Sequence, residues 1–220
     1  VDIYSFRFEK WRVDLQSEDV QLIDVVAVNN RIYVVTVQKD YAVSLLNVYN
    51  GTFEWTLTVN GSIEPNSLTG TDNWLLLTSR KNYRSAIQVV DGHNGRLMWD
   101  FVMGGHGEGF DPVVDHQRVY VGGADREERF RRDDKDIYPI RLYCLDTVSG
   151  DILWQSHEWY SYVSGDQREK LLLSNNSTEP EGREGILCVD TDNGIQHILN
   201  RATGELLWMY DTNTLTVIRY

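Results

Sequence analysis

The sequence predicts an all-β protein built from copies of one supersecondary unit. A turn that ends in glycine is followed four residues later by tryptophan at four places, each preceded by an alternating or apolar run. These tryptophans stand at positions 55, 99, 154 and 208, so that the successive steps are 44, 55 and 54 residues. Units of about 40 to 55 residues suit propeller blades of four antiparallel strands. The expected fold is therefore a β-propeller.

The chemistry of the turn explains each copy. Glycine permits the positive φ that a tight turn between two strands needs, and Asn, Ser or Thr just before it favours the same turn. On the strand that follows, even spacing places residues on one face, so Phe53 and Trp55, or Leu206 and Trp208, are expected to point the same way. A large indole at a fixed place would pack against the neighbouring unit. The residues expected to dock the units are Trp11, Trp55, Trp99, Trp154, Trp208, Gly51, Gly95, Gly150 and Gly204.

Strand-like runs recur along a single domain of 220 residues, and no convincing amphipathic helix interrupts them. Full blades are expected at residues 20–58, 64–103, 111–158 and 160–210, and part of a blade at residues 1–15 and 214–220. If the strand at 214–220 pairs beside the N-terminal strands, a small five-bladed ring closes. Otherwise open edges invite pairing with another chain, or the chain is a segment of a larger propeller. The incomplete or partnered forms are favoured.

The last copy carries a family resemblance. Residues 189–208 run Val-Asp-Thr-Asp-Asn-Gly-Ile-Gln-His-Ile-Leu-Asn-Arg-Ala-Thr-Gly-Glu-Leu-Leu-Trp, which resembles the repeat of the pyrroloquinoline quinone (PQQ) propellers. Residues 145–154 and 90–99 resemble it nearly as well. The resemblance implies a PQQ-like, broadly WD40-like propeller fold through at least four blades. Many unrelated functions share this scaffold, so the resemblance alone does not imply one.

The resemblance also indicates what a catalytic relative would need. The dehydrogenases of this superfamily hold PQQ at the centre of an eight-bladed ring, between a tryptophan and a disulfide of adjacent cysteines, with Ca²⁺ held by Glu, Asn and Asp. This chain has two cysteines, Cys144 and Cys188, which are not adjacent. No Gly-x-Ser-x-Gly elbow, His-Glu-x-x-His motif or phosphate-binding glycine loop is present in the sequence. We therefore expect no enzyme activity and no cofactor.

The formal net charge is −12 and the sequence pI is near 4.8. An acidic chain does not suit nucleic acid or an anionic membrane surface as a partner. One segment, residues 125–136, places eleven charges of both signs among twelve residues. It is expected to be either a solvated hairpin insertion or a loop that docks a partner through Arg126, Arg129, Phe130 and Arg131.

Two further segments contain groups that could bind a ligand. Asp190 and Asp192 alternate before Gly194, a spacing that Ca²⁺ loops use, although the family repeat has a plain hairpin turn there. His106, Glu108 and Asp111 lie in a glycine-rich stretch that is expected to connect two blades. That stretch is either a simple connection or a ligand or metal site.

Compartment signals are sparse. Cys144 and Cys188 each lie in an apolar strand, which is typical of buried free thiols, and a disulfide between them is the alternative. Asn50, Asn60, Asn175 and Asn176 each begin an Asn-x-Ser/Thr glycosylation acceptor pattern. The resembled family is mostly extracytoplasmic, which favours the periplasm, the secretory lumen or secretion. No signal peptide or membrane span is recognisable, so the chain is expected to be mature or truncated.

The function expected from these observations is that of a non-catalytic binding or scaffolding module, which mediates protein–protein interaction in a larger assembly or dimerises. A divergent PQQ/Ca²⁺ dehydrogenase fragment is one alternative. A carbohydrate-binding propeller with Trp159, Tyr160 and Tyr162 at a sugar site is another. Replacing Trp99, Trp154 or Trp208 with alanine is expected to destabilise the fold by roughly 3 to 5 kcal/mol.

Overall fold

The computed structural model describes residues 20–71, 73–82, 84–103, 112–115, 117–124, 130–132, 135–156, 159–162, 170–173, 186–190 and 194–218. These residues form nineteen strands and no helix, which confirms the all-β prediction. Accordingly, no described segment is a helix that is long and apolar enough to cross a membrane.

The first two sheets are four-stranded antiparallel meanders, in which each strand pairs with the next along the chain. The first contains β1 (Gln21–Val28), β2 (Arg31–Val37), β3 (Tyr41–Asn47) and β4 (Phe53–Val59). The second contains β5 (Ser62–Gly70), β6 (Trp74–Lys81), β7 (Arg84–Asp91) and β8 (Leu97–Val102). Each is the four-stranded unit that the repeat predicts.

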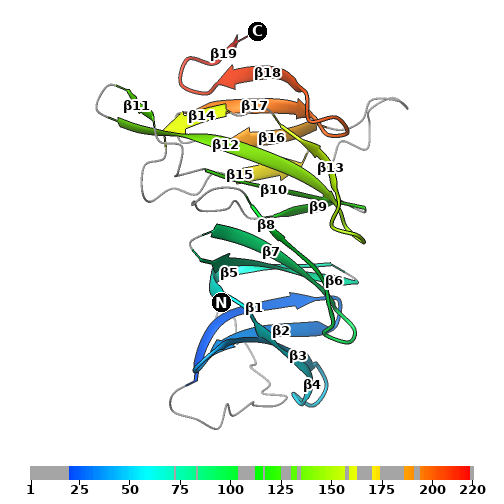
Figure 1. Ribbon diagram of the computed structural model, residues 1–220. Coiled ribbons are helices and arrows are strands. Elements are labelled where there is room, and N and C mark those ends of the chain that lie inside the picture. The colour runs from blue at the N-terminus through cyan, green and yellow to red at the C-terminus, as the bar shows by residue number, and fades with distance from the viewer. Residues whose placement is uncertain are drawn as a thin grey trace, which may run out of the picture.

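The third sheet has the same four-stranded centre and an extension. The centre is β9 (Val113–Asp115), β10 (Arg118–Ala124), the second half of β12 (Lys135–Asp146) and β13 (Ile152–Gln155). The first half of β12 pairs instead with β11 (Phe130–Arg132) and β14 (Trp159–Tyr162). The charged segment 125–136 therefore contributes β11 and the start of β12 to a hairpin, which projects to the left in Figure 1.

The fourth sheet has five strands in chain order. They are β15 (Lys170–Leu173), β16 (Ile186–Asp190), β17 (Ile195–Asn200), β18 (Leu206–Asp211) and β19 (Thr216–Ile218). The C-terminal strand β19 pairs with β18 at the outer edge of this sheet. Residues 1–15, which were expected to share a blade with it, lie outside the described residues.

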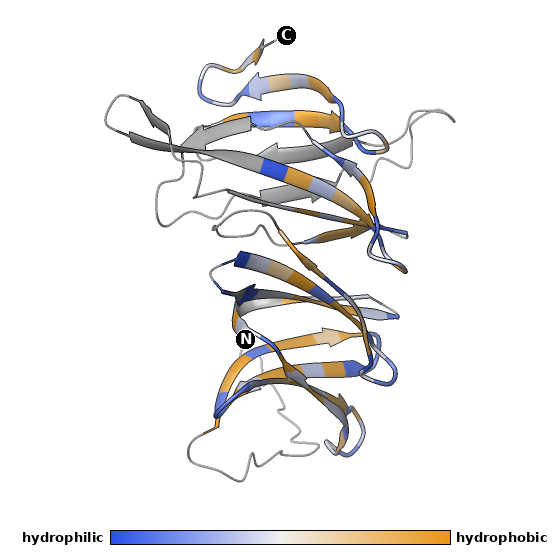
Figure 2. Ribbon diagram, viewed as in Figure 1, coloured by the Kyte–Doolittle hydropathy of each residue, from blue (hydrophilic) through white to orange (hydrophobic). Residues whose placement is uncertain are grey.

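The four sheets stack face to face in chain order, from the bottom to the top of Figure 1. The core lies between them as three clusters. The first joins Tyr33 and Leu45 to Leu75 of the second sheet, and the next joins Val89 to Val119 of the third. The last cluster joins residues of the third sheet, including Tyr120, Cys144 and Trp154, to Leu199 of the fourth. In Figure 2 the hydrophobic residues lie along the strands and the hydrophilic ones gather at the turns.

The strand that carries the repeat tryptophan in each sheet differs from the sequence expectation in one respect. A register shift lies just before each tryptophan, so that Trp208 pairs with Ile198 while Leu206 pairs with the adjacent Leu199. The same shift occurs before Trp55, Trp99 and Trp154. A β-bulge breaks the alternation of side chains, so residues two apart no longer share a face. Leu206 accordingly packs on the cluster toward the third sheet, and the even-spacing expectation was wrong.

Candidate functional site

The repeated turn is built around an Asp or Asn that stands four residues before the glycine. Asp146 Oδ1 accepts hydrogen bonds from the backbone N–H groups of Val148 (2.9 Å) and Ser149 (2.8 Å). These donors hold the pKa of the Asp146 carboxyl below its usual value. Asn47 and Asn200 accept the corresponding pair of N–H groups in their own turns, which are completed by glycines with φ between 72° and 76°.

The glycine of each later turn receives the tryptophan of the preceding sheet. A Cβ placed on Gly95 would lie 2.5 Å from Cδ2 of Trp55, and one on Gly150 would lie 2.7 Å from Cδ2 of Trp99. A Cβ on Gly204 would lie 2.5 Å from Cε3 of Trp154. These distances leave no room for any side chain. Glycine is therefore required at each place for two reasons, the positive φ and the close approach of the indole.

Two of the indoles are also fixed by a hydrogen bond. Trp99 Nε1 donates to the carbonyl of Thr147 at 2.9 Å, and Trp154 Nε1 donates to that of Arg201 at 3.1 Å. Each acceptor stands three residues before the glycine that the same indole covers. The contact between the first and second sheets differs. There the corresponding carbonyl, that of Gly92, accepts from the Tyr33 hydroxyl at 3.2 Å. The buried Trp55 Nε1 has no hydrogen-bond partner.

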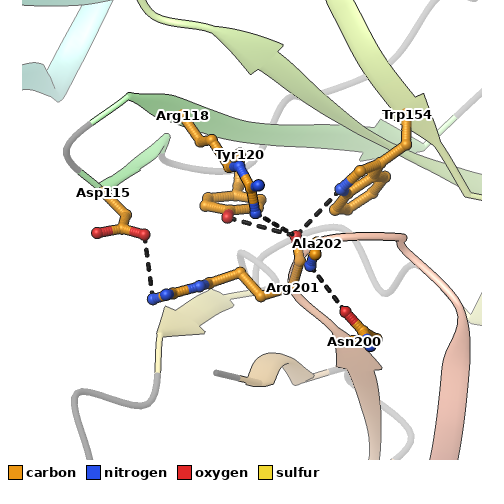
Figure 3. Close-up of polar contacts among 7 residues, drawn as sticks. All are labelled: Asp115, Arg118, Tyr120, Trp154, Asn200, Arg201 and Ala202. Atoms are coloured by element: carbon orange, nitrogen blue, oxygen red, sulfur yellow. Dashed lines mark hydrogen bonds and ion pairs between the residues drawn. The ribbon is translucent and has the colours of Figure 1, made fainter. Parts of the chain in front are cut away.

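At the junction of the third and fourth sheets, several polar contacts converge on Arg201 (Figure 3). Besides Trp154, the carbonyl of Arg201 accepts from the Tyr120 hydroxyl at 3.4 Å and from Arg118 Nη1 at 3.5 Å. Arg201 Nη1 lies 3.0 Å from the carboxylate of Asp115. Burial raises the pKa of Tyr120 to about 12, so its hydroxyl remains a donor. These contacts fix the fourth sheet on the third.

Trp208 is the last tryptophan of the series and differs from Trp154 in exposure. The Trp208 side chain is 38% exposed, against 9% for Trp154. A fifth copy of the turn follows it, in which Asp211 Oδ1 accepts from the N–H groups of Asn213 (2.8 Å) and Thr214 (3.2 Å). Leu215, with φ of 57°, stands in the place of the glycine. The Gly-x-x-x-Trp pattern does not include this copy because Leu215 replaces the glycine, although Asp211 with Thr214 gives the signal.

Among the other predicted docking residues, Gly51 has φ of 72° and is buried. Trp11 lies outside the described residues. So do His106, Glu108 and Asp111 of the predicted ligand loop, and Arg126 and Arg129 of the partner loop. Asp192, Asn175 and Asn176 lie outside them too. No cluster of three or more His, Cys, Asp or Glu within the described ranges is arranged to hold a metal ion.

The remaining predicted residues fall on strands or turns. Phe130 and Arg131 lie on β11, opposite Ile137 and Asp136 of β12. Asp190 ends β16 opposite Gln196, and Gly194 has φ of 76°, close to the value in the repeated turns.

The aromatic residues of the predicted sugar site lie on a strand, and the two described asparagines of the predicted glycosylation sites are exposed. Trp159, Tyr160 and Tyr162 form part of β14 and pair with β12. Asn50 and Asn60 are exposed, and Asn50 Oδ1 accepts from the N–H of Thr52 at 3.0 Å. Cys144 is a buried free thiol, and burial raises its pKa to about 11. Cys144 is therefore not part of a disulfide.

Comparison with solved structures supports the propeller fold. A europium-containing methanol dehydrogenase matches with a TM-score of 0.57 and 14% identity, over 85% of this chain and 41% of its own. The quinohemoprotein alcohol dehydrogenase from Comamonas testosteroni matches with a TM-score of 0.58 and 15% identity, over 85% and 34%. The computationally designed Ika4 protein matches with a TM-score of 0.58 and 11% identity, over 89% and 99%. The chain thus spans less than half the length of either dehydrogenase.

Sequence comparison gives the family. None of the curated proteins compared with the chain matches it in sequence. The family model described as outer membrane protein assembly factor BamB matches residues 83–219, which is more than half of the chain. These residues include the second, third and fourth tryptophans of the series and the glycine turns of three sheets. The chain therefore belongs to the family of outer membrane protein assembly factor BamB, within the superfamily of PQQ-repeat β-propellers.

Proposed function

We propose that this chain is a non-catalytic propeller module that binds a protein partner within an extracytoplasmic assembly. The observation that carries the proposal is the exposure of large apolar side chains on the terminal sheets. Leu22 and Val25 on β1 are 56% and 47% exposed. On the last sheet, Trp208 is exposed together with Leu207, Leu215 and Val217. Exposed apolar surface of this kind is typical of protein interfaces, and tryptophan is enriched at their energetic centres.

The described residues do not fit a quinone cofactor. In the resembled dehydrogenases a disulfide of adjacent cysteines covers the PQQ ring. Here Cys144 is a free thiol buried between the third and fourth sheets, and Cys188 lies on β16, in a different sheet. The indole rings of Trp99 and Trp154 are already packed against Gly150 and Gly204 of the following sheets. We therefore derive no reaction step through PQQ.

The proposed compartment is outside the cytoplasm. The matched family description names an outer membrane assembly factor, which supports this compartment. Asn50 and Asn60 are exposed and could accept a glycan if the source organism glycosylates in a secretory lumen. The source compartment also determines whether glycans are expected, because only some extracytoplasmic compartments add them.

The proposal is tested on the protein purified from its natural source. Native mass spectrometry is expected to find this chain with a second, different polypeptide at a fixed ratio. The same preparation, given PQQ and Ca²⁺ with a primary alcohol, is expected to leave an artificial electron-acceptor dye unreduced. Recovery of the chain without any second polypeptide would contradict the binding role. Dye reduction that depends on added PQQ would support the dehydrogenase alternative instead.

A further inference from the structure

Four Asn-Gly pairs occur in the sequence, at residues 50–51, 60–61, 94–95 and 193–194. Asparagine is a thermolabile residue, and it is most reactive before glycine, because no side chain obstructs the glycine nitrogen. Asn193 lies outside the described residues, which leaves three pairs to compare. The asparagines of these three pairs are all exposed, so access to water does not distinguish them. Their hydrogen bonds do.

The pair in the first sheet is held by the repeated turn. The N–H of Gly51 donates to the carbonyl of Asn47 at 2.8 Å. Asn50 Oδ1 accepts from the N–H of Thr52 at 3.0 Å and from its hydroxyl at 2.8 Å. The glycine nitrogen and the asparagine amide are therefore each bonded to another partner, and these bonds must break before the nitrogen can approach the amide carbon.

The pair in the second sheet is held in the same way. The N–H of Gly95 donates to the carbonyl of Asp91 at 2.9 Å. Asn94 Oδ1 accepts from the N–H of Arg96 at 2.9 Å, and Asn94 Nδ2 donates to Asp91 Oδ2 at 3.0 Å. The turn thus occupies both the oxygen and the nitrogen of the Asn94 amide.

The pair at residues 60–61 lies in the connection between β4 and β5, outside the repeated turns. Gly61 has φ of 131°, a conformation that glycine adopts readily and other residues do not. Within the described part of the chain, neither the Gly61 N–H nor the Asn60 side chain has a hydrogen-bond partner. The backbone carbonyl of Asn60 accepts from Gln88 Nε2 at 3.3 Å, which leaves the side-chain amide available.

We propose that Asn60 is a deamidation site of the folded protein. The Gly61 nitrogen loses its proton and attacks Cγ of Asn60, the new C–N bond closes a succinimide ring, and the amide nitrogen leaves as ammonia. Water then opens the ring at either carbonyl and gives aspartate or isoaspartate. The reaction is a hydrolysis and needs no oxidant or reductant. A glycan on Asn60 would block it, because the amide nitrogen is then substituted.

Isoaspartate changes a closely packed connection. The main chain then runs through the side-chain carbon atoms, so the connection gains a methylene group, and the former carbonyl of Asn60 becomes a carboxylate beside the buried Gln88. Val59 and Ile63, on either side of the connection, are buried in the cluster between the first two sheets. Because a close-packed core transmits small displacements, the modified chain is expected to be less stable. This inference goes beyond the proposed function and does not depend on a protein partner.

Peptide mapping by mass spectrometry tests the proposal on the full chain, produced without glycans and incubated in mildly alkaline buffer. In the folded chain, conversion at Asn60 is expected to be about tenfold or more faster than at Asn50 and Asn94, because each of those sites must first break at least two hydrogen bonds. The same chain unfolded in guanidinium chloride is the control, and there the three sites are expected to react at similar rates. Similar rates in the folded chain, or a preference for Asn60 that persists in the unfolded chain, would overturn the proposal.

The variant Asp91→Ala provides a matched control within the folded chain. It removes the carboxylate that holds the Asn94 amide, so conversion at Asn94 is expected to rise about fivefold or more while conversion at Asn60 stays the same. If Asn94 is not accelerated in the folded variant, hydrogen bonding does not control the reaction and the inference fails. Should the variant not fold, the comparison of the folded with the unfolded wild type still decides.

The effect on stability is measured on the modified chain itself. Anion exchange separates it from the unmodified chain, because deamidation adds a negative charge. The urea midpoint of the chain modified at Asn60 is expected to be lower than that of the unmodified chain. An unchanged midpoint would contradict the effect on the connection between the first two sheets.

Discussion

The indole of Trp154 lies on Gly204 of the following sheet, so closely that a Cβ on that glycine would be 2.5 Å from Cε3 of the ring. The same indole donates to the carbonyl of Arg201 at 3.1 Å, three residues before the glycine. One residue pair thus combines apolar packing, a hydrogen bond and a backbone conformation that only glycine adopts readily. The packing of a tryptophan on a turn glycine recurs at all three junctions of the four sheets, and Trp99 and Trp154 add the hydrogen bond. This relation explains why the tryptophan and the glycine recur together in the sequence.

The first prediction compares two tryptophans of the same repeat. Trp154→Ala is expected to reduce the free energy of unfolding by about 3 to 5 kcal/mol, because it leaves a cavity beside Gly204. Trp208→Ala is expected to cost the isolated chain less than about 1.5 kcal/mol, because the Trp208 side chain is 38% exposed. This revises the equal losses expected from the sequence. Urea unfolding of the purified chain measures both, and equal losses would contradict the difference in docking.

The second prediction concerns the glycine of the contact. Gly150→Ala is expected to destabilise the chain by about 2 to 4 kcal/mol. Alanine at φ of +76° is strained, and its Cβ would lie 2.7 Å from Cδ2 of Trp99. In a Trp99→Ala background, Gly150→Ala is expected to cost only the backbone strain of about 1 to 2 kcal/mol. A double-mutant cycle by urea unfolding measures the coupling, and strictly additive losses would argue against the contact.

The third prediction tests how the inner strands meet. A Cβ on Gly70 of β5 would lie 2.5 Å from Cγ2 of Val28 on β1. Gly70→Ala is therefore expected to cost about 1 to 3 kcal/mol by overpacking, although alanine suits a strand better than glycine. The further substitution Val28→Ala is expected to recover part of this loss by making room. Thermal unfolding of the single variants and of the double variant measures these losses of stability. A double variant whose loss is as large as the sum of the losses of Val28→Ala and Gly70→Ala would rule out the close approach.

The fourth prediction concerns pH. His197 is a buried residue of β17, and burial lowers the pKa of its imidazole. The unfolded chain, with an ordinary histidine pKa of about 6.5, therefore takes up a proton before the folded chain does. Stability is fully present above that value and is lost as pH falls toward the lower folded-state pKa. The urea midpoint of the wild type is expected to fall more between pH 7 and pH 5 than that of His197→Gln. Parallel pH profiles would contradict this assignment.

Particular residues account for what the sequence could and could not predict. The Gly-x-x-x-Trp spacing predicted the four sheets, because that spacing is fixed by the turn and the docked indole. It did not predict the β-bulge before each tryptophan, since a bulge depends on pairing with the neighbouring strand. The pairing of β14 with the first half of β12 could not be predicted, because it lies outside the four-stranded repeat unit. The role of Trp11 stays a prediction; it stands 40 residues before Gly51, as Trp55 does before Gly95.

The exposed position of Trp208 could not be predicted from sequence either. Its local sequence follows the same pattern as that of Trp154, with Gly four residues before and an apolar strand around it. What differs is whether a following turn covers the indole, and that depends on tertiary arrangement. The repeat therefore predicts the shape of the contact, and only the structure distinguishes the three tryptophans that are covered from the one that is exposed.

The most direct test is native mass spectrometry of the chain purified from its natural source. The chain is expected to be recovered with a second, different polypeptide at a fixed ratio. Recovery of the folded chain without any second polypeptide would contradict the claim that this propeller module binds a protein partner.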